Sequence, residues 1–136
     1  FVQIKVGPYQ VINDAYNANP DSTIAALETF RRIKTSGRRI FIMGDMLELG
    51  QYAMQGHKRV GKAVAQADID RFYGVGTLTA YAIETAARAG LKAAYYFSTK
   101  SDLLAALKSD LKEGDTLLVK GSRGSRMEEI IEGLSQ

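Results

Sequence analysis

Short apolar runs alternate along the whole chain with stretches in which apolar residues recur every three or four positions. The runs predict β-strands, and the helical spacing predicts amphipathic helices between them. We expect strands at 1–6, 9–14, 38–44, 71–75, 93–97 and 116–120. We expect helices at 20–36, 56–67, 77–89, 100–112 and 125–134.

The first predicted helix has clear boundary signals. Asn19 is a good capping residue and Pro20 suits the first helical turn, so we assign Pro20 a structural role. Gly37 is expected to end this helix. The first two strands flank a turn at Gly7 and Pro8, which predicts a short antiparallel hairpin.

Strands separated by single helices predict a mostly parallel sheet with right-handed connections and helices on both faces. The strand "RRIFIMG" at 38–44 has a continuous apolar centre, as expected for a sheet that is covered on both faces. The predicted fold class is therefore α/β: a doubly wound, Rossmann-like, six-stranded sheet whose first two strands form the short N-terminal hairpin. The 136 residues suit a single domain at 1–136.

Composition and charge exclude several classes of protein. The chain has no cysteine, which excludes disulfides and thiolate metal sites, and no other group of residues predicts a metal site. The net charge is +3, but the basic residues are scattered, so we expect no nucleic-acid partner. No apolar run approaches the ~18 residues that a membrane span needs, so we expect no membrane partner. Because the chain does not begin with methionine, we expect it to be a piece of a longer one.

Polar side chains collect where predicted strands end, which is where open α/β sheets bind ligands. Three stretches stand out: the first loop "DAYNANPDS" at 14–22, the second loop "GDMLELG" at 44–50 and the third loop "KGSRGSRME" at 120–128. The candidate binding residues in them are Asp14, Tyr16, Asn17, Asn19, Asp45, Met46, Glu48, Lys120, Gly121, Ser122 and Arg123. Acids and amides together with a basic loop are suited to a zwitterion or a phosphorylated ligand.

Each loop also has a plainer structural interpretation. Asp14 and Asn19 are residue types that satisfy turn amides and cap helices. Met46 and Leu49 can return to the core, so that the second loop is only a turn. The third loop either binds an anion through backbone N–H groups or lies in solvent. His57, the only histidine, stands near a helix start, where a capping or packing role competes with a catalytic one.

The stretch "GVGTLT" at 74–79 suggests a dinucleotide site, because it follows a strand and opens a helix. However, Thr79 replaces the third glycine of G-x-G-x-x-G, and the next strand ends without an acid for the ribose. A G-x-x-x-x-G-K-[ST] phosphate loop is absent. We therefore expect neither NAD binding nor ATP hydrolysis by this chain alone.

Taken together and in this order, the three loops closely resemble the C-terminal domain of the Mur ligases, and the resemblance covers essentially all 136 residues. It implies one domain of a three-domain enzyme, whose N-terminal and central domains are its partners. It also implies an ATP-dependent, amide-forming ligase of the bacterial cytoplasm that adds D-alanyl-D-alanine to a UDP-N-acetylmuramoyl-tripeptide through an acyl phosphate in peptidoglycan synthesis. ATP and Mg²⁺ would be bound mainly by the central domain, so we expect the isolated domain to be inactive.

The resemblance also implies roles for the candidate residues. Those expected to face the nucleotide are Asp14, Tyr16, Asn17 and Asn19. Those expected to hold the incoming dipeptide are Asp45, Met46, Glu48, Lys120, Gly121, Ser122 and Arg123. Asp45 or Glu48 would orient its ammonium group. Arg123 or Lys120 would bind its carboxylate, for which the planar guanidinium of arginine is well shaped. His57 would brace the second loop.

Two other functions stay open on the sequence alone. The chain can be a stand-alone nucleotide- or anion-binding α/β module without catalysis, or a structural domain whose polar loops only cap helices. The three hypotheses differ in what they require of the structure. A ligase domain requires the three loops to meet on one rim of the sheet and to form part of a pocket there.

Overall fold

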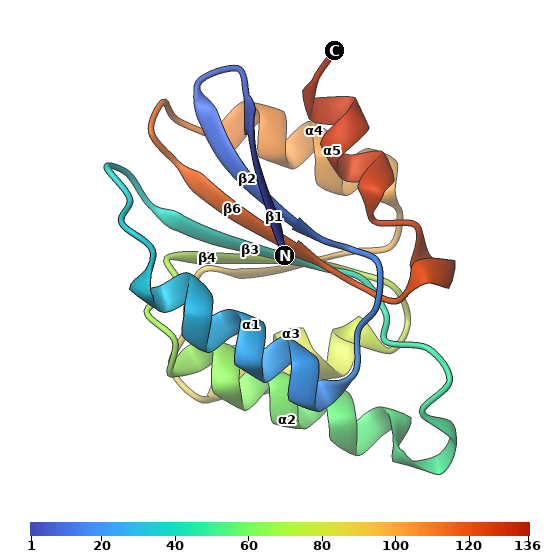
Figure 1. Ribbon diagram of the computed structural model, residues 1–136. Coiled ribbons are helices and arrows are strands. Elements are labelled where there is room, and N and C mark those ends of the chain that lie inside the picture. The colour runs from blue at the N-terminus through green and yellow to red at the C-terminus, as the bar shows by residue number, and fades with distance from the viewer.

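A six-stranded sheet lies between two layers of helices in the computed structural model, which describes all residues 1–136 (Figure 1). The strands are β1 (Val2–Val6), β2 (Tyr9–Asp14), β3 (Arg39–Met43), β4 (Arg71–Val75), β5 (Ala94–Phe97) and β6 (Thr116–Lys120). Their order is β1-β2-β6-β3-β4-β5; β1 is antiparallel to β2, and all other neighbours are parallel. The predicted doubly wound α/β fold with an N-terminal hairpin is confirmed.

Helices cover both faces of the sheet, with α1, α2 and α3 on one face and α4 and α5 on the other (Figure 1). Their bounds are α1 (Pro20–Arg32), α2 (Ala53–Ala65), α3 (Thr79–Arg88), α4 (Lys100–Asp110) and α5 (Glu128–Leu134). Two short 3₁₀ turns, η1 (Gly50–Tyr52) and η2 (Arg123–Ser125), precede α2 and α5. None of the helices combines the length and the apolar character that crossing a membrane requires.

Alternate residues of the central strands belong to two separate apolar layers. Phe41 of β3 and Phe72 of β4 lie in the layer under α1–α3, where their rings stack with centroids 5.2 Å apart. Ile40 and Ile42 lie in the layer under α4 and α5. Because successive strand side chains point to opposite faces, a strand between two helical layers needs apolar residues at every position. This explains the continuous apolar centre of β3.

Helix α1 begins as predicted but ends earlier. The Asn19 side chain accepts a hydrogen bond from the Ser22 backbone N–H (2.8 Å), and the Ser22 hydroxyl accepts one from the Asn19 N–H (3.0 Å). The helix is shorter than predicted because Ile33 already has an extended backbone (φ −75°, ψ 132°). Gly37 does not end the helix. A Cβ at Gly37 would overlap the backbone of Gly114, so a close approach of two loops requires glycine there.

Two further helices start at positions other than those predicted. Helix α2 begins at Ala53 instead of 56, because the η1 turn leads directly into it. Helix α5 begins at Glu128 instead of 125, because Arg126 has a left-handed backbone (φ 53°) that interrupts the helical path. The other predicted boundaries lie within two residues of the observed ones.

Strand β6 lies between β2 and β3, so the carboxyl ends of these three strands are neighbours. Lys120 of β6 is in register with Asp14 of β2 and with Met43 of β3. After β2 and β3 the chain turns to the face of α1 and α2, whereas after β6 it turns to α5 on the other face (Figure 1). A reversal of this kind opens a crevice at the carboxyl ends of the strands. The three polar loops begin there.

Candidate functional site

Ser122 of the third loop ties the three loops together. Its backbone N–H donates to the carbonyl of Asp45 (3.1 Å), and its hydroxyl accepts from the N–H of Leu47 (2.7 Å), both in the second loop. The same hydroxyl donates to the carbonyl of Ala18 in the first loop (3.2 Å). The prediction that these three segments meet on one rim of the sheet is therefore confirmed.

A pocket opens where the loops meet, and we call it the three-loop pocket. Its volume is about 640 Å³, which suits a small molecule. All three loops contribute to its lining, which consists of Tyr16, Asn17, Ala18, Leu47, Glu48, Ser122, Arg123, Gly124, Arg126 and Glu128. Of the candidates from the sequence, Tyr16, Asn17, Glu48, Ser122 and Arg123 line this pocket.

Lys120 and Asp14 bind each other instead of lining the pocket. The Lys120 ammonium lies 2.8 Å from a carboxylate oxygen of Asp14 and also donates to the carbonyl of Asn17 (3.1 Å). The Lys120 side chain is only 1% exposed. The sequence predicts contacts with two different ligands instead, the nucleotide for Asp14 and the dipeptide for Lys120. The structure brings them together in a pair that anchors the first loop to the end of β6.

Asp45 is held at the start of α3. One of its carboxylate oxygens accepts hydrogen bonds from the backbone N–H (2.8 Å) and the hydroxyl (2.7 Å) of Thr79. A Cβ at Gly76, where φ is +109°, would overlap this carboxylate. The "GVGTLT" stretch therefore requires a glycine at 76 so that Asp45 can reach the first turn of α3, which gives the motif a structural explanation.

A second hollow, the adjoining pocket, has a volume of about 390 Å³. Its lining is Gly44, Asp45, Leu47, Val75, Gly76, Ser98, Thr99, Lys100, Gly124, Ser125 and Met127. Leu47 and Gly124 line both pockets. Sequence reasoning missed Ser98 and Lys100 as pocket residues, although they follow β5 and so lie at the same edge of the sheet. Their position directly after a predicted strand is the feature of the sequence that could have identified them as pocket residues.

Arg123 lies against Tyr16 at the mouth of the three-loop pocket. Its guanidinium donates to the Tyr16 hydroxyl (2.6 Å), and its central carbon lies 4.4 Å from the centre of the Tyr16 ring. Neither Arg123 nor Arg126 forms an ion pair with an acidic side chain. The pocket is thus bordered by two cations without acidic partners.

His57 and Met46 hold the second loop from below. His57 is fully buried; its Nε2 accepts from the Met46 backbone N–H (3.0 Å), and its Nδ1 lies 2.7 Å from the carbonyl of Ala53. Because Nε2 accepts, the proton belongs on Nδ1 and the ring is neutral. Burial lowers the pKa of His57 below its usual value, in agreement with this assignment. The Met46 side chain is buried in the core, where its sulfur accepts from the Thr23 hydroxyl (3.6 Å).

The remaining candidates differ in exposure. Glu48 is exposed and has a left-handed backbone (φ 65°). Gly121 is buried, and a Cβ there would overlap the side chains of Ser125 and Met127. Asn19 and Pro20 form the start of α1. The structure contains no cluster of three or more acidic or histidine side chains that could hold a metal ion.

Comparison with known proteins identifies the family. The model of the family described as "Mur ligase, glutamate ligase domain" matches residues 1–123. The chain belongs to the Mur ligase family. The resemblance that the three loops carry in the sequence is thereby confirmed.

Two curated relatives share the name UDP-N-acetylmuramoyl-tripeptide--D-alanyl-D-alanine ligase. The Bacillus subtilis protein is 38% identical over 125 residues, which are 91% of this chain and 27% of the relative. The Escherichia coli protein is 38% identical over 128 residues, which are 93% of this chain and 27% of the relative. The chain therefore spans about a quarter of the length of these relatives.

Solved structures of the family have the same fold. A MurF structure from Acinetobacter baumannii superposes with a TM-score of 0.84 at 28% identity, covering 98% of this chain and 30% of that one. A MurF ligase from Thermotoga maritima, solved in complex with ADP, superposes with a TM-score of 0.80 at 21% identity, covering 98% of this chain and 29% of that one. At 21% identity the second match shows the fold alone.

Proposed function

We propose that this chain is the C-terminal domain of an ATP-dependent ligase that adds D-alanyl-D-alanine to a UDP-N-acetylmuramoyl-tripeptide in peptidoglycan synthesis, in the bacterial cytoplasm. The names of the curated relatives support this reaction, and the N-terminal and central domains of such an enzyme would account for the length of the relatives beyond the match. The single observation that carries the proposal is the three-loop pocket, because a domain that only capped its own helices would not need it.

In the proposed reaction, ATP phosphorylates the terminal carboxylate of the tripeptide. The dipeptide amine then attacks the acyl phosphate, and the tetrahedral intermediate collapses to an amide with loss of phosphate. Because the chain has no acidic cluster suited to Mg²⁺, we assign magnesium and most of the ATP contacts to the central domain. The share of this chain is to complete the pocket and to orient the two reactants.

The first loop faces the nucleotide in this proposal. Asn17 is exposed and lines the three-loop pocket, so its amide is available to ribose or base. Tyr16 is exposed beside it, but its ring lies against Arg123 of the third loop, so we assign Tyr16 to the dipeptide side of the pocket. Asp14 and Asn19 act on the shape of the loop, Asp14 through Lys120 and Asn19 through the start of α1. Their contribution to nucleotide binding is therefore mainly indirect.

The second and third loops hold the dipeptide. Arg123 provides the cation for its carboxylate, because a guanidinium can donate two parallel hydrogen bonds to a carboxylate. Glu48 is the exposed acid in the same pocket and is placed to orient the ammonium group. Met46 and Gly121 are buried and support the two loops from within. Asp45, also an acid, borders the adjoining pocket, into which the dipeptide can extend.

Catalysis by this domain then rests on orientation. Holding an amine and an acyl phosphate in line contributes up to about 7–11 kcal/mol in well-ordered systems. Hydrogen bonds between the loops support such an orientation: Ser122 bonds to the first and second loops, and His57 holds the backbone of Met46. The pocket walls are therefore set before a ligand enters.

Arg123→Ala in the full-length enzyme tests the proposal. We expect KM for D-alanyl-D-alanine to rise about 10- to 100-fold, since hydrogen bonds to a charged group are lost, while KM for ATP changes little. The measurement is phosphate release in the presence of the UDP-tripeptide. Arg88→Ala is the matched control, because Arg88 is 80% exposed and pairs only with Glu84 of its own helix. Wild-type kinetics in Arg123→Ala would contradict the role of Arg123. Phosphate release that does not depend on the dipeptide in the wild type would contradict the proposed function.

A further inference from the structure

The contact between Tyr16 and Arg123 joins the first and third loops across the mouth of the three-loop pocket. Both side chains are exposed, and Tyr16 keeps 67% of its surface accessible. Exposed pairs of this kind contribute little to folding. Nevertheless the pair has two well-formed interactions, a hydrogen bond of 2.6 Å and a cation over the ring at 4.4 Å. Stability alone therefore does not account for it.

We propose that Tyr16 is a positioning residue for Arg123, which it holds ready to receive the carboxylate of the incoming dipeptide. The inference rests on the proposed function and adds the residue that orients its key cation. A guanidinium has five N–H donors. Tyr16 accepts from one NH₂ group of Arg123, and no other protein group accepts from this side chain. The remaining donors stay available to a ligand, while contact with the ring restricts the conformations of the arginine.

A third hollow, beside the pair, gives a reason for holding Arg123. Its volume is about 310 Å³, and its lining is Asn13, Ala15, Tyr16, Arg123 and Glu128. Tyr16, Arg123 and Glu128 also line the three-loop pocket. The pair thus borders both spaces, and Glu128 does so with it. Without the Tyr16 ring, Arg123 is free to turn toward the Glu128 carboxylate, which would compete with the dipeptide carboxylate for the same donors.

Holding a long side chain in its bound conformation lowers the entropic cost of binding. Tyr16→Leu removes the contact that holds Arg123. We therefore expect it to raise KM for D-alanyl-D-alanine by about threefold to tenfold, with a smaller change in KM for ATP. Tyr16→Phe keeps the ring and loses only the hydroxyl, so its effect should be smaller. Because Tyr16 acts through Arg123, Tyr16→Leu should have no further effect on KM for the dipeptide when Arg123 is already alanine.

The experiment is a double-mutant cycle in the full-length enzyme with Tyr16→Leu, Tyr16→Phe, Arg123→Ala and the double variants Tyr16→Leu/Arg123→Ala and Tyr16→Phe/Arg123→Ala. The readouts are kcat, both KM values and the melting temperature. Tyr96→Leu is the matched control, because Tyr96 is 43% exposed on the edge strand β5 and forms no side-chain hydrogen bond. Non-additive effects on KM for the dipeptide support the inference. If Tyr16→Leu lowers the melting temperature, Tyr16→Phe is read in its place.

Three results would overturn the inference. Additive effects of the Tyr16 and Arg123 substitutions would show that the two residues act independently. A larger rise in KM for ATP than for the dipeptide would show that Tyr16 acts on the nucleotide. A wild-type enzyme without dipeptide-dependent phosphate release would overturn the proposed function together with this inference, whereas the first two results leave the proposed function standing.

Discussion

Each end of the parallel strands holds a buried ion pair, and the two ends differ in what surrounds it. At the amino end Asp115 is 1% exposed and its partner Arg38 is 22% exposed. At the carboxyl end Lys120 is 1% exposed and its partner Asp14 is 22% exposed. The buried member is therefore an acid at one end and a base at the other. Within each pair the charged nitrogen and oxygen lie 2.8 Å apart, so this distance does not distinguish the two ends.

At the amino end the charged groups around Asp115 bond to one another. Asp115 accepts from the Arg38 guanidinium, the Arg38 N–H and the Lys112 N–H. Burial alone would raise the pKa of Asp115, but these hydrogen bonds outweigh it and lower that pKa below its usual value. Asp110 accepts from the Tyr73 hydroxyl and pairs with Arg71 (3.2 Å). Little bonding capacity is left for a ligand.

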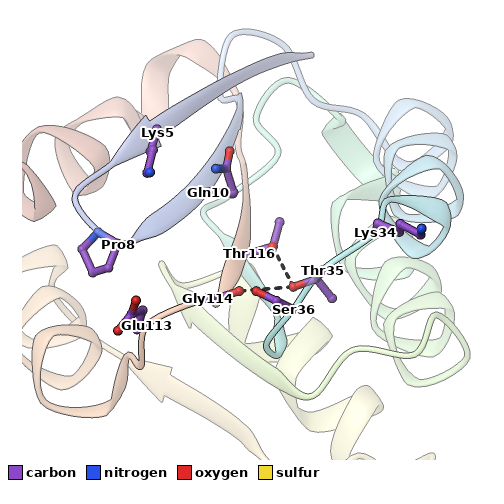
Figure 2. A pocket seen from close by; sticks show the side chains of 9 residues that line it. All are labelled: Lys5, Pro8, Gln10, Lys34, Thr35, Ser36, Glu113, Gly114 and Thr116. Carbon is purple, nitrogen blue, oxygen red and sulfur yellow. Dashed lines mark hydrogen bonds between the residues drawn. The ribbon is translucent and has the colours of Figure 1, made fainter.

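A polar hollow also lies at this end of the strands, and two of its hydroxyls are bonded to protein groups. Its volume is about 580 Å³, and no hydrophobic residue lines it. Figure 2 shows two hydroxyls of the hollow bonded to protein groups: Thr116 donates to Thr35 (2.8 Å), and Thr35 donates to the carbonyl of Gly114 (3.3 Å). Lys5 and Lys34 stand on opposite sides of the hollow (Figure 2). Neither lysine forms an ion pair, and the same holds for Arg123 and Arg126 at the carboxyl end. At the carboxyl end, however, Arg123 is held against Tyr16 by a hydrogen bond of 2.6 Å and by contact with the ring. The difference teaches that an unpaired cation held in place by a neighbouring side chain, not unpaired charge alone, marks the site.

Asp14→Ala gives the largest effect that the comparison predicts. It leaves the ammonium of Lys120 buried with the carbonyl of Asn17 as its remaining partner. Removing one partner of a buried pair typically costs about 3–5 kcal/mol. We expect a loss of this size in the free energy of unfolding, measured by urea denaturation. Asp14→Asn, which keeps a hydrogen-bond acceptor, is the control and should lose less. Equal stability of Asp14→Ala and the wild type would show that the pair does not anchor the first loop.

Arg38→Ala tests the other end, and we expect a smaller loss of about 2–3 kcal/mol. The buried carboxylate of Asp115 keeps two backbone N–H donors when the guanidinium is gone, whereas Lys120 keeps one acceptor. The readout is again urea denaturation, together with KM for both substrates in the full-length enzyme. Because the amino end is far from the pocket along the strands, both KM values should stay at wild-type levels. A changed KM for the dipeptide would break the division between a stabilising end and a binding end.

The apolar pattern was sufficient to predict the fold class and all eleven main strands and helices. It could not predict that β6 inserts between β2 and β3, because the order of strands depends on contacts between distant segments. The Lys120–Asp14 pair follows from that order, so a sequence reading assigns both residues to ligands. The hydrogen bond from Thr79 to Asp45 could not be predicted for the same reason, since it joins the second loop to the start of α3 and only the sheet brings these segments together. Arg123, by contrast, is a candidate from the third loop alone, without knowledge of the strand order.

Helix boundaries failed where backbone conformation changed without a proline or glycine signal. Ile33 ends α1 in an extended conformation, and Arg126 delays α5 with a positive φ. Isoleucine is compatible with an extended backbone and arginine is uncommon at a positive φ, but neither residue type by itself marks a helix boundary in the sequence. By contrast, Asn19 and Pro20 mark the start of α1 by local chemistry that the sequence displays directly.

The smallest expected effect is a dependence of stability on pH. It is due to His57, which bonds to the backbone of the second loop. Its pKa in the folded protein is below the usual 6.5, first because of burial, which outweighs the opposing influence of the Ala53 carbonyl and the Asp45 charge. The unfolded chain therefore takes up a proton at higher pH than the folded one. The contribution of His57 is complete above about pH 6.5 and decreases as the pH falls from there toward the folded pKa. Protonation would also turn Nε2 into a donor and break its bond to the Met46 N–H.

The measurement compares the free energy of unfolding at pH 7.5 and at pH 5 for the wild type and for His57→Gln. Each unit by which the pKa differs between the folded and the unfolded state corresponds to about 1.36 kcal/mol. We expect His57→Gln to be less stable at pH 7.5 but to lose less stability than the wild type on acidification. Tyr96→Leu serves as the control and should keep the wild-type slope, because Tyr96 is exposed on β5 and forms no hydrogen bond with the second loop. Parallel slopes for the wild type and His57→Gln would mean that the histidine titrates alike in both states, and the neutral, bonded ring under the second loop would then be wrong.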